Sequence, residues 1–585
     1  MSKTSTVRAE IAATEAIAEP TALALFHPCT QAWFTEAFAS PTRVQSESWP
    51  FLRKGESSLM LAPTGSGKTL AAFLAALDGL LFAEKKPVPG VKVIYISPLK
   101  ALGVDVDRNL RAPLAGISAA AAREGTGHNA VTVAIRSGDT ESRERARMLK
   151  EPPDVLITTP ESLYLMLTSR ARDILQSVET IILDEIHTMV PTKRGTHLFL
   201  SLERLEQLRC QQLPGIRPIQ RIGLSATQRP LEEVARLLGG FERDKSGQSQ
   251  PRQVQIIDAS EKRPFELTIC MPLGDQVDQT ADEFNVVGNA ATSPVPASIW
   301  PAIYPRLVAL IGDHQSTMIF VNSRRLAERL AASINETAEQ DLARAHHGSM
   351  SKDTRSEVED RLKRGDLRAI VATSSMELGI DMGAVDIVIQ VEAPPSISSG
   401  LQRIGRAGHS VGAVSKGIVF PKYRGDLLSA AAAAQQMLNG QVESSTYLRN
   451  PLDVLAQHIV AMVAMDEWDV EALYQILRCA APFAELPRAS FEEVLNLLSG
   501  RYPSDDFSGL KARITWDRIN NRLIPRRGAQ RTAILNAGTI PDRGLYGVFL
   551  LGGSETKSRV GELDEEMVFE LQIGEVFRLG ASMWR

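Results

Sequence analysis

Short apolar runs recur along the first half of the chain, and segments with a helical spacing of apolar residues separate most of them. These runs cover residues 58–61, 91–97, 131–135, 154–158, 180–183 and 221–224. Continuous apolar runs of this length are typical of strands that are buried on both faces. Their alternation with helices predicts a parallel sheet with right-handed crossovers. The rhythm returns at residues 263–269, 317–321, 369–373 and 385–391, which predicts a second sheet of the same kind.

Polar clusters follow these runs, where α/β proteins place their functional groups. The first run leads into Ala-Pro-Thr-Gly-Ser-Gly-Lys-Thr and then into a helix-patterned segment. A strand, a glycine-rich loop and a helix in this order are the context of a phosphate-binding loop. We expect Lys68 to reach the β- and γ-phosphates of a nucleotide and Thr69 to bind Mg²⁺. The predicted nucleotide-binding residues of the loop are Thr64, Gly65, Ser66, Gly67, Lys68 and Thr69.

An acidic pair ends a later strand of the same predicted domain. Asp184 is predicted to hold the Mg²⁺ of a nucleoside triphosphate, and Glu185 could orient and deprotonate the attacking water. A solvated pair of carboxylates at a strand end is the alternative. His187 could bond to Ser225 or Thr227 and so link hydrolysis to movement, or it could be a buried histidine with its hydrogen bonds satisfied.

Three more side chains fit a nucleotide site. Gln45 precedes the phosphate loop, and its amide offers the donor and acceptor that an adenine edge needs, although a surface glutamine is an alternative. Arg403 and Arg406 are three residues apart, so on a helix they share a face and could point at one phosphate chain. Because the second domain shows no nucleotide loop, we expect these arginines to reach the γ-phosphate across the interface. A basic solvated turn is the alternative.

Composition sets wider bounds. A chain of 585 residues suggests roughly three to five domains, and its net charge of −4 requires that any contacts to nucleic acid be local. The four cysteines are far apart, which argues against a zinc site and a disulfide framework and suits the cytoplasm. No apolar run approaches the length of a membrane span.

The motifs in this order resemble those of superfamily 2 helicases. They are APTGSGKT, SPLKAL, TTPESL, DEIH, SAT, FVNSRR, ATSSMELGID and QRIGRAGH. The DEIH box, the QRIGRAGH ending and the segment NPLDVLAQ at residues 450–457 are similar to the bacterial large helicase-related (Lhr) family. The resemblance runs from about Phe26 to the last residue.

The resemblance implies an α/β fold with two tandem RecA-like phosphate-loop domains, a winged-helix domain and the start of a β-rich domain. The expected parts are a flexible leader at 1–22, the ATP-binding domain at 23–250, the second motor domain at 251–435, the winged-helix domain at 436–525 and a partial β-rich domain at 526–585. The residue pattern alone predicts only a small helical module in the fourth part. Because the β-rich domain is longer in the family, we expect a truncated chain.

The resemblance also carries roles to individual residues. The expected catalytic residues are Lys68, Asp184, Glu185, Gln402, Arg403 and Arg406. Gly379 and Asp381 would contact the nucleotide, while His187, Ser225 and Thr227 would couple hydrolysis to motion. The residues expected to track the nucleic-acid backbone are Pro98, Lys100, Thr159, Asn322, Arg324, Ser349 and Thr373.

The function implied is that of an ATP- and Mg²⁺-dependent helicase that moves 3′-to-5′ on single-stranded DNA. Its expected partners are single-stranded DNA, tailed duplexes and RNA:DNA hybrids, and no membrane. DNA repair in a bacterial cytoplasm, at the nucleoid, is the role implied by analogy. An RNA-remodelling helicase and an ATP-binding clamp that does not unwind are the alternatives.

Overall fold

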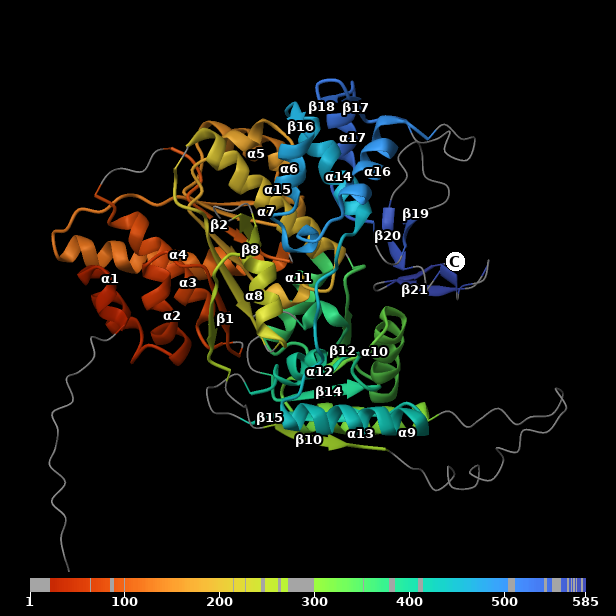
Figure 1. The fold of residues 1–585 in the computed structure, drawn as a ribbon. Coiled ribbons are helices and arrows are strands. Elements are labelled where there is room, and N and C mark those ends of the chain that lie inside the picture. The colour runs from red at the N-terminus through yellow and green to blue at the C-terminus, as the bar shows by residue number, and fades with distance from the viewer. Residues whose placement is uncertain are drawn as a thin grey trace, which may run out of the picture.

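The computed structural model describes residues 22–271 and 299–540, together with parts of 544–584. The gaps inside the two long ranges are residues 64, 85–88, 99, 214, 227, 244–247, 261–264, 351, 378–384, 409–413 and 503–510. Figure 1 shows one α/β unit at the upper left, a second below it, and the C-terminal helices, drawn in blue, beside α6 and α7 of the first. None of the helices in the described residues combines the length and the apolar character that crossing a bilayer requires.

The first sheet has seven parallel strands in the order β3-β4-β2-β5-β6-β1-β9. Their bounds are β1 Ser58–Leu61, β2 Val93–Ile96, β3 Val133–Arg136, β4 Val155–Thr158, β5 Thr180–Leu183, β6 Gln220–Ser225 and β9 Gln255–Asp258. Strand β9 pairs with β1, so the boundary expected after residue 250 falls inside the first domain. Only Ile257 of β9 is fully buried, and the strand therefore lacks the continuous apolar run that marks the others.

Helices cover both faces of this sheet. They are α1 Pro28–Ala37, α2 Arg43–Arg53, α3 Lys68–Leu81, α4 Lys100–Arg123, α5 Ser142–Lys150, α6 Pro160–Leu167, α7 Lys193–Gln212 and α8 Leu231–Gly239, and the short pair β7 Phe241–Arg243 and β8 Ser249–Pro251 follows. Successive residues of β1 face opposite clusters: Leu59 packs with the cluster that contains Leu202 of α7, and Met60 with the one that contains Leu74 of α3. The phosphate loop therefore starts from a strand that is fixed on both sides.

The second sheet has six parallel strands in the order β10-β15-β14-β11-β13-β12. Its strands are β10 Phe265–Ile269, β11 Thr317–Phe320, β12 Ala343–His346, β13 Ala369–Ala372, β14 Ile387–Val391 and β15 Ser415–Phe420. The helices around it are α9 Trp300–Asp313, α10 Arg324–Ala338, α11 Lys352–Lys363, α12 Ile397–Ile404 and α13 Arg424–Asn439. The expectation of two tandem α/β domains is confirmed.

The C-terminal part begins with three helices and a small antiparallel sheet. The helices are α14 Leu452–Val463, α15 Val470–Leu477 and α16 Arg488–Ser499, and the strands are β16 Trp468–Asp469, β17 Ile514–Asp517 and β18 Arg522–Pro525 in the order β16-β18-β17. Three helices with a two- or three-stranded wing form a winged-helix domain. Two hairpins follow: β19 Leu545–Phe549 with β20 Arg559–Asp564, and β21 Phe577–Leu579 with β22 Ser582–Trp584.

The boundary expected after residue 525 is too early. Helix α17, Ala529–Leu535, buries Ala529 and Ala533 against Val460 and Ala461 of α14. This helix therefore packs as part of the winged-helix domain rather than as the start of a β-rich domain.

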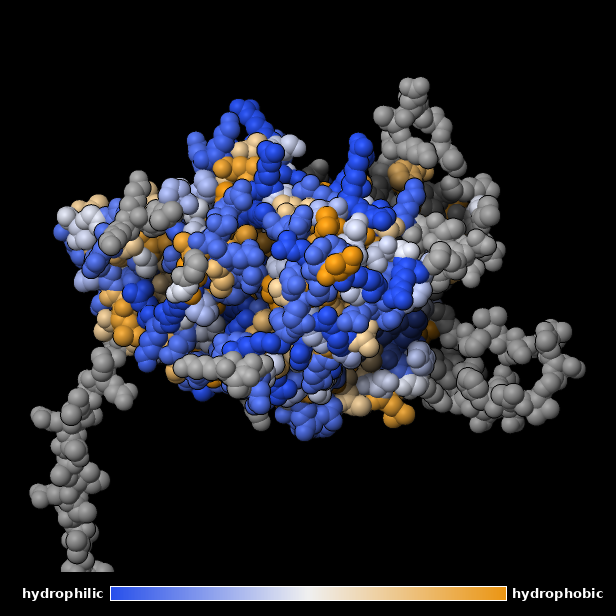
Figure 2. Space-filling view, turned by 45° about the horizontal axis from the view of Figure 1, so that its top comes forward, coloured by the Kyte–Doolittle hydropathy of each residue, from blue (hydrophilic) through white to orange (hydrophobic). Residues whose placement is uncertain are grey.

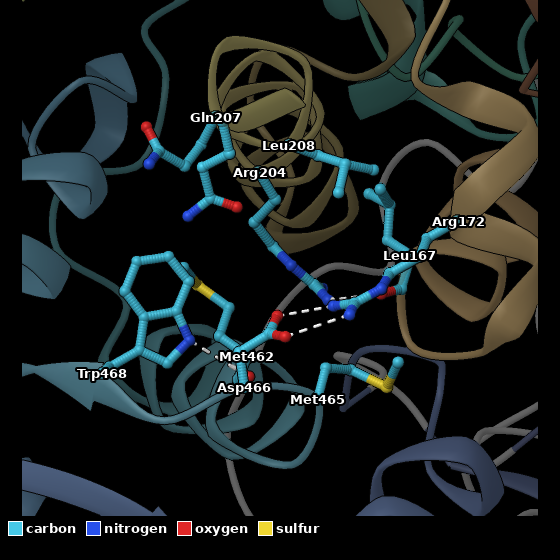
Figure 3. A pocket seen from close by; sticks show the side chains of 10 residues that line it. Leu167, Arg172, Arg204, Gln207, Leu208, Met462, Met465, Asp466 and Trp468 are labelled. Carbon is cyan, nitrogen blue, oxygen red and sulfur yellow. Dashed lines mark hydrogen bonds and ion pairs between the residues drawn. The ribbon is translucent and has the colours of Figure 1, made fainter. Parts of the chain in front are cut away.

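The winged-helix domain is fastened to the first motor domain by charged contacts. Figure 3 shows the small pocket between α7 and α14, where Arg172 forms a two-pronged ion pair with Asp466 at 2.5 and 3.0 Å. Nζ of Lys193 lies 2.8 Å from Asp453 on α14. These contacts join segments that are more than 250 residues apart in the sequence, so the two domains form one packed unit.

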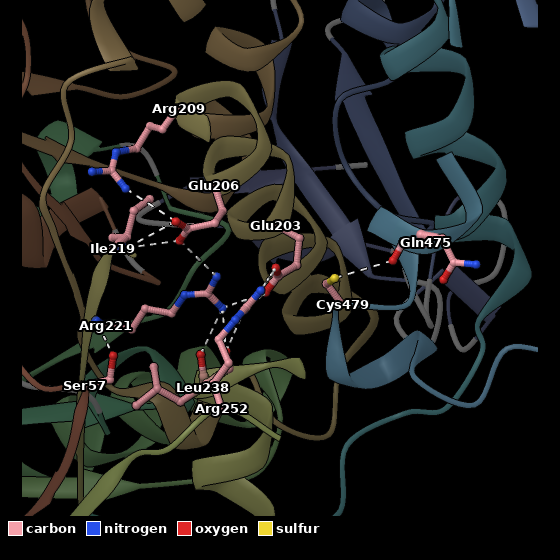
Figure 4. A network of polar contacts seen from close by, with 11 residues as sticks. Ser57, Glu203, Glu206, Arg209, Ile219, Arg221, Leu238, Arg252, Gln475 and Cys479 are labelled. Atoms are coloured by element: carbon pink, nitrogen blue, oxygen red, sulfur yellow. Dashed lines mark hydrogen bonds and ion pairs between the residues drawn. The ribbon is translucent and has the colours of Figure 1, made fainter. Parts of the chain in front are cut away.

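Figure 4 shows a second, buried network at the same junction. Glu203 of α7 accepts hydrogen bonds at 2.8 Å from both Arg221 of β6 and Arg252. Burial alone would raise the pKa of Glu203, but the two guanidinium groups outweigh it and lower that pKa, so the carboxylate is ionised. Beside this network the backbone N–H of Phe241 donates to the carbonyl of Cys479 at 2.7 Å, which extends the connection to the winged-helix domain.

Three rings meet in the core of this interface. The ring centroids of Tyr164 and His197 are 4.6 Å apart, and those of His197 and His458 are 4.5 Å apart. Burial lowers the pKa of His197 to about 3 and lowers the pKa of His458 well below its usual range. Both imidazoles are therefore neutral in the folded protein at physiological pH.

We expect this interface to lose stability when the pH falls. In the unfolded chain each histidine takes up a proton near pH 6.5, whereas in the folded chain it stays neutral to a much lower pH. The stability that the neutral ring provides is present above pH 6.5 and is lost below it, at up to about 1.4 kcal/mol per pH unit for each histidine. Urea unfolding at pH 7.5 and 5.5 should therefore show a smaller pH difference for His458→Leu than for the unchanged protein.

The exposed His128 supplies the control, because His128→Leu should keep the full pH difference. An equal pH difference in the unchanged protein and in both variants would contradict the assignment of a neutral, buried His458.

Candidate nucleotide site and strand-end surface

The phosphate loop connects β1 to α3 through backbone conformations that glycine adopts without strain. Gly65 and Gly67 have φ values of 79° and 85°, in the left-handed region that favours glycine. A Cβ at Gly67 would also lie 2.6 Å from Nε2 of Gln45. Nζ of Lys68 donates to the carbonyl of Pro63 at 2.8 Å and to that of Ala62. The ammonium group therefore lies inside the curl of the loop, where a phosphate would lie.

Gln45 braces this loop. Its Oε1 accepts from the backbone N–H of Thr42 at 2.9 Å, and its Nε2 donates to the carbonyl of Gly67 at 3.4 Å. The hydroxyl of Thr42 donates to the carbonyl of Ser66 at 2.8 Å. The expectation that Gln45 reads an adenine edge is not what this geometry shows, because both ends of its buried amide bind protein groups.

The side chains around the loop fit a nucleotide with a divalent cation. The hydroxyl of Ser66 is buried and finds no hydrogen-bond partner among the described residues, so it is available to a phosphate oxygen. Burial and the adjacent charge of Glu185 raise the pKa of Asp184 to about 6. A cation beside two buried carboxylates would favour their ionised forms. Thr69, half-buried on the first turn of α3, completes a hydroxyl and carboxylate donor set that suits Mg²⁺.

Tyr95 is a residue of this site that the motifs do not reveal. Its hydroxyl donates to the carboxylate of Asp184 across the sheet. The ring stacks on Phe73 of α3 with a centroid distance of 5.2 Å, and burial raises the pKa of Tyr95 well above its usual value. The tyrosine lies in the apolar run at 91–97, where its only sequence signal is a hydroxyl in a buried strand.

His187 connects the first motor domain to the second. Its Nδ1 lies 3.4 Å from Oγ of Ser225 and 3.5 Å from the backbone N–H of Ala226. Its Nε2 lies 2.8 Å from the amide of Gln402 on α12. Burial, together with the charge of Lys68, lowers the pKa of His187 to about 4, so the ring that bridges the two domains is neutral.

The two arginines at the end of α12 do not share a helical face. The helix ends at Ile404, so Arg406 lies in the turn beyond it, although the side chains of both arginines reach Glu377. Nη2 of Arg406 donates to the carbonyl of Glu377 at 2.5 Å, and Arg406 is buried, with 5% of its surface exposed.

Arg403 is held inside the second domain. Its Nε donates to Glu377 at 2.7 Å, and its Nη1 donates to the side chains of Asn322 and Gln390, at 2.9 Å each. The expectation that Arg403 faces a phosphate chain is therefore wrong in this structure. Asn322 also donates to the carbonyl of Ala393 at 2.8 Å, so its amide is engaged at both ends rather than directed at a nucleic-acid backbone.

The other strand-end residues have mixed surroundings. The structure brings Arg324 and Ser349 together, with Nη1 of the arginine 2.7 Å from the serine hydroxyl. Thr159 lies at the position before α6, where its hydroxyl donates to that of Ser162 at 3.1 Å, and Thr373 is buried at the end of β13. The residues Thr64, Thr227, Gly379 and Asp381 lie outside the described residues, as does the side chain of Lys100.

Three family models match the chain in succession. The model of DEAD/DEAH box helicases matches residues 42–235, the helicase conserved C-terminal domain matches 302–410, and the winged helix domain of large helicase-related protein matches 435–585. The two parallel sheets, the phosphate loop and the acidic pair Asp184–Glu185 thus define a two-domain helicase motor.

Comparison with individual proteins identifies the helicase family more narrowly. The "Lhr helicase/ probable uracil glycosylase" of Mycolicibacterium smegmatis is 50% identical over 96% of this chain and 38% of its own length. The "ATP-dependent helicase Lhr-Core protein 2" of Thermococcus barophilus is 39% identical over 94% of this chain and 61% of its own. The structure of Mycobacterium smegmatis helicase Lhr bound to ssDNA and AMP-PNP superposes with a TM-score of 0.78 at 48% identity, over 97% of this chain and 68% of that one.

These likenesses place the chain in the Lhr helicase family. The chain spans 38% of the length of the M. smegmatis protein and of the "Lhr helicase/uracil glycosylase" of Escherichia coli, which is 45% identical to it. The helicase MrfA bound to DNA and AMPPNP has a TM-score of 0.69 at 18% identity, which shows a shared fold.

Proposed function

We propose that this chain is an ATP-driven motor that moves on single-stranded DNA and separates duplexes. The observation that carries the proposal is the bridge at His187. This residue lies two positions after Glu185 and contacts Gln402 of the other domain at 2.8 Å. A change at the nucleotide would thereby reach the second domain, as a motor requires.

The proposed roles in hydrolysis follow from the geometry of the first domain. Lys68 and the loop N–H groups bind the phosphates, and Glu185 takes the proton of the attacking water. Thr69 and Asp184 would hold Mg²⁺, which neutralises phosphate charge when it is bound. Tyr95 fixes the orientation of the Asp184 carboxylate, and Arg406 would stabilise the charge that develops on the transferred phosphoryl group.

The proposed path for nucleic acid runs over the strand ends. Arg324 and Ser349 offer a cation and a hydroxyl side by side in the second domain, and Thr159 lies at the corresponding edge of the first. Contacts of this kind bind a sugar–phosphate backbone without reading sequence. The ssDNA and AMP-PNP bound to the M. smegmatis relative support this proposal.

The direction, the substrates and the biological role rest on the family resemblance. We infer 3′-to-5′ movement, unwinding of DNA duplexes and RNA:DNA hybrids, and a role in DNA repair in the bacterial cytoplasm. Strand-separation assays on duplexes with a 3′ or a 5′ single-stranded DNA tail test this directly. Unwinding of the 3′-tailed substrates only is the expected result, and equal or better unwinding of 5′-tailed substrates would contradict the polarity.

The contact between His187 and Gln402 can be tested by substitution. Because Gln402→Ala removes the contact with His187, we expect it to reduce the stimulation of ATP hydrolysis by DNA about tenfold, the size of an ordinary coupling energy. ATP affinity should change little, since Gln402 lies in the second domain. Steady-state ATPase assays with and without single-stranded DNA give both quantities.

Gln435→Ala is the matched control. Gln435 contacts Asn439 on the surface of α13, so its loss should leave the stimulation intact. Full stimulation in the Gln402→Ala protein would show that the contact does not carry the coupling.

A further inference from the structure

The turn that starts α7 is fixed by two features of its own sequence. The hydroxyl of Thr192 accepts a hydrogen bond from the backbone N–H of Gly195 at 3.0 Å and so caps the helix. A Cβ at Gly195 would lie 1.9 Å from the carbonyl oxygen of Met189. Only glycine fits at position 195. Because Thr192 and Gly195 are fixed in this way, the backbone of Lys193 and Arg194 between them is fixed as well.

Arg194 joins the ends of two neighbouring strands. Its Nε and Nη2 donate to the two carboxylate oxygens of Glu161 at 2.5 and 3.0 Å, and its Nη1 donates to the carbonyl of Pro98 at 2.8 Å. Pro98 follows β2, and Glu161 lies on the first turn of α6 just after β4, the strand that pairs with β2. The planar guanidinium makes three directed bonds, which a lysine ammonium cannot reproduce in this geometry.

The charge state of the pair supports a lasting contact. Burial would raise the pKa of Glu161, but its hydrogen bonds to Arg194 outweigh burial and lower that pKa. The carboxylate is thus ionised at physiological pH. Both side chains keep about a third of their surface exposed, at 34% and 35%, so the clamp lies at the surface of the strand ends rather than in the core.

The residue before Arg194, Lys193, contacts the winged-helix domain. Lys193 pairs with Asp453 on α14, while Arg194 reaches the strand ends of the first sheet. The first turn of α7 begins eight residues after Glu185. This turn contacts the winged-helix domain through Lys193 and the segments after β2 and β4 through Arg194.

We propose that Arg194 is a positioning residue for nucleic acid, which holds the strand ends after β2 and β4 at one spacing so that their backbone and hydroxyl groups match successive phosphates. This inference rests on the proposed function and adds to it a residue that contacts neither nucleotide nor the reacting atoms. Loss of the clamp would let the two strand ends move independently. The effect would appear in the affinity for DNA and not in the chemistry of hydrolysis.

The test compares Arg194→Gln, Arg194→Lys and Glu161→Gln in the full chain. We expect each variant to raise the DNA concentration for half-maximal ATPase stimulation about tenfold, which corresponds to about 1.4 kcal/mol. The KM for ATP should change much less. The Arg194→Gln and Glu161→Gln effects should be less than additive in the double variant, because both variants disrupt the paired bonds between Arg194 and Glu161. Single-stranded oligothymidylate serves as the DNA, and thermal melting monitors folding.

Arg123→Gln provides the matched control. Arg123 forms an equally two-pronged pair with Glu36, at 2.8 Å for both bonds, but it lies on exposed helices away from these strand ends. Its loss should leave DNA dependence unchanged.

Three results would overturn the inference. One is a DNA concentration for half-maximal stimulation that neither Arg194→Lys nor Glu161→Gln changes. The second is an equal loss of ATP binding and of DNA-free hydrolysis, which indicates general damage. The third is an unchanged protein that hydrolyses ATP without any response to DNA, and that result would also remove the proposed function. The first two results would leave the proposed function standing.

Discussion

Replacing Glu185 by glutamine is expected to slow ATP hydrolysis by about 10²- to 10⁴-fold while ATP still binds. Glutamine keeps the shape of the side chain but cannot accept the proton of the attacking water. Glu185 is 9% exposed and has a backbone φ of 47°, directly after Asp184. Its charge, after burial, contributes to the raised pKa of the adjacent Asp184.

Single-turnover hydrolysis and equilibrium binding of ATP measure the two effects separately. Glu179→Gln is the control, because Glu179 lies at the opposite end of the same strand with a side chain that is 64% exposed. Turnover that Glu185→Gln leaves unchanged would exclude Glu185 as the base.

Replacing Arg406 by alanine is expected to lower kcat by about 10³-fold and to alter ATP affinity far less. An arginine that acts on the developing charge of the transition state stabilises that state more than the bound substrate. The structure holds Arg406 through the carbonyl of Glu377, so its guanidinium belongs to the second domain and would act across the interface. The bridge between His187 and Gln402 places that domain against the nucleotide-binding one.

Initial rates over a range of ATP concentrations separate kcat from KM for this variant. Arg364→Ala, at an arginine of the second domain with a 66% exposed side chain, is the control. A large rise in KM with an unchanged kcat would make Arg406 a binding residue that does not act on the transition state.

The fold could be predicted where a strand is buried on both faces. Such strands read as continuous apolar runs, as at β1, β2, β4, β5 and β6, and the half-buried edge strand β3 also has an apolar run. Strand β12, Ala343–His346, escaped this reading because it is an edge strand whose sequence Ala-Arg-Ala-His alternates. The wing strands β16 to β18 escaped it because they are two to four residues long and draw their stability from the helices beside them.

The residues of the candidate site could likewise be predicted only where a local sequence pattern specifies them. A phosphate loop is a local structure, so eight consecutive residues specify its glycines, its lysine and its helix start. Contacts between distant segments leave no such pattern. Tyr95 and Asp184 are 89 residues apart, and Arg194 and Glu161 are 33 apart. The spacing of Arg403 and Arg406 is a poor guide for a related reason, because a helix ends between them and acceptors from three distant segments surround Arg403.

The central claim is that nucleotide hydrolysis in this chain is coupled to single-stranded DNA. Steady-state ATP hydrolysis without nucleic acid, and with single-stranded DNA, single-stranded RNA or blunt duplex DNA, tests it most directly. Relative to the rate without nucleic acid, we expect strong stimulation by single-stranded DNA and little by single-stranded RNA or blunt duplex DNA. Equal or stronger stimulation by RNA would contradict it in favour of an RNA-remodelling motor, and a folded protein that binds ATP without hydrolysing it under any condition would contradict the motor itself.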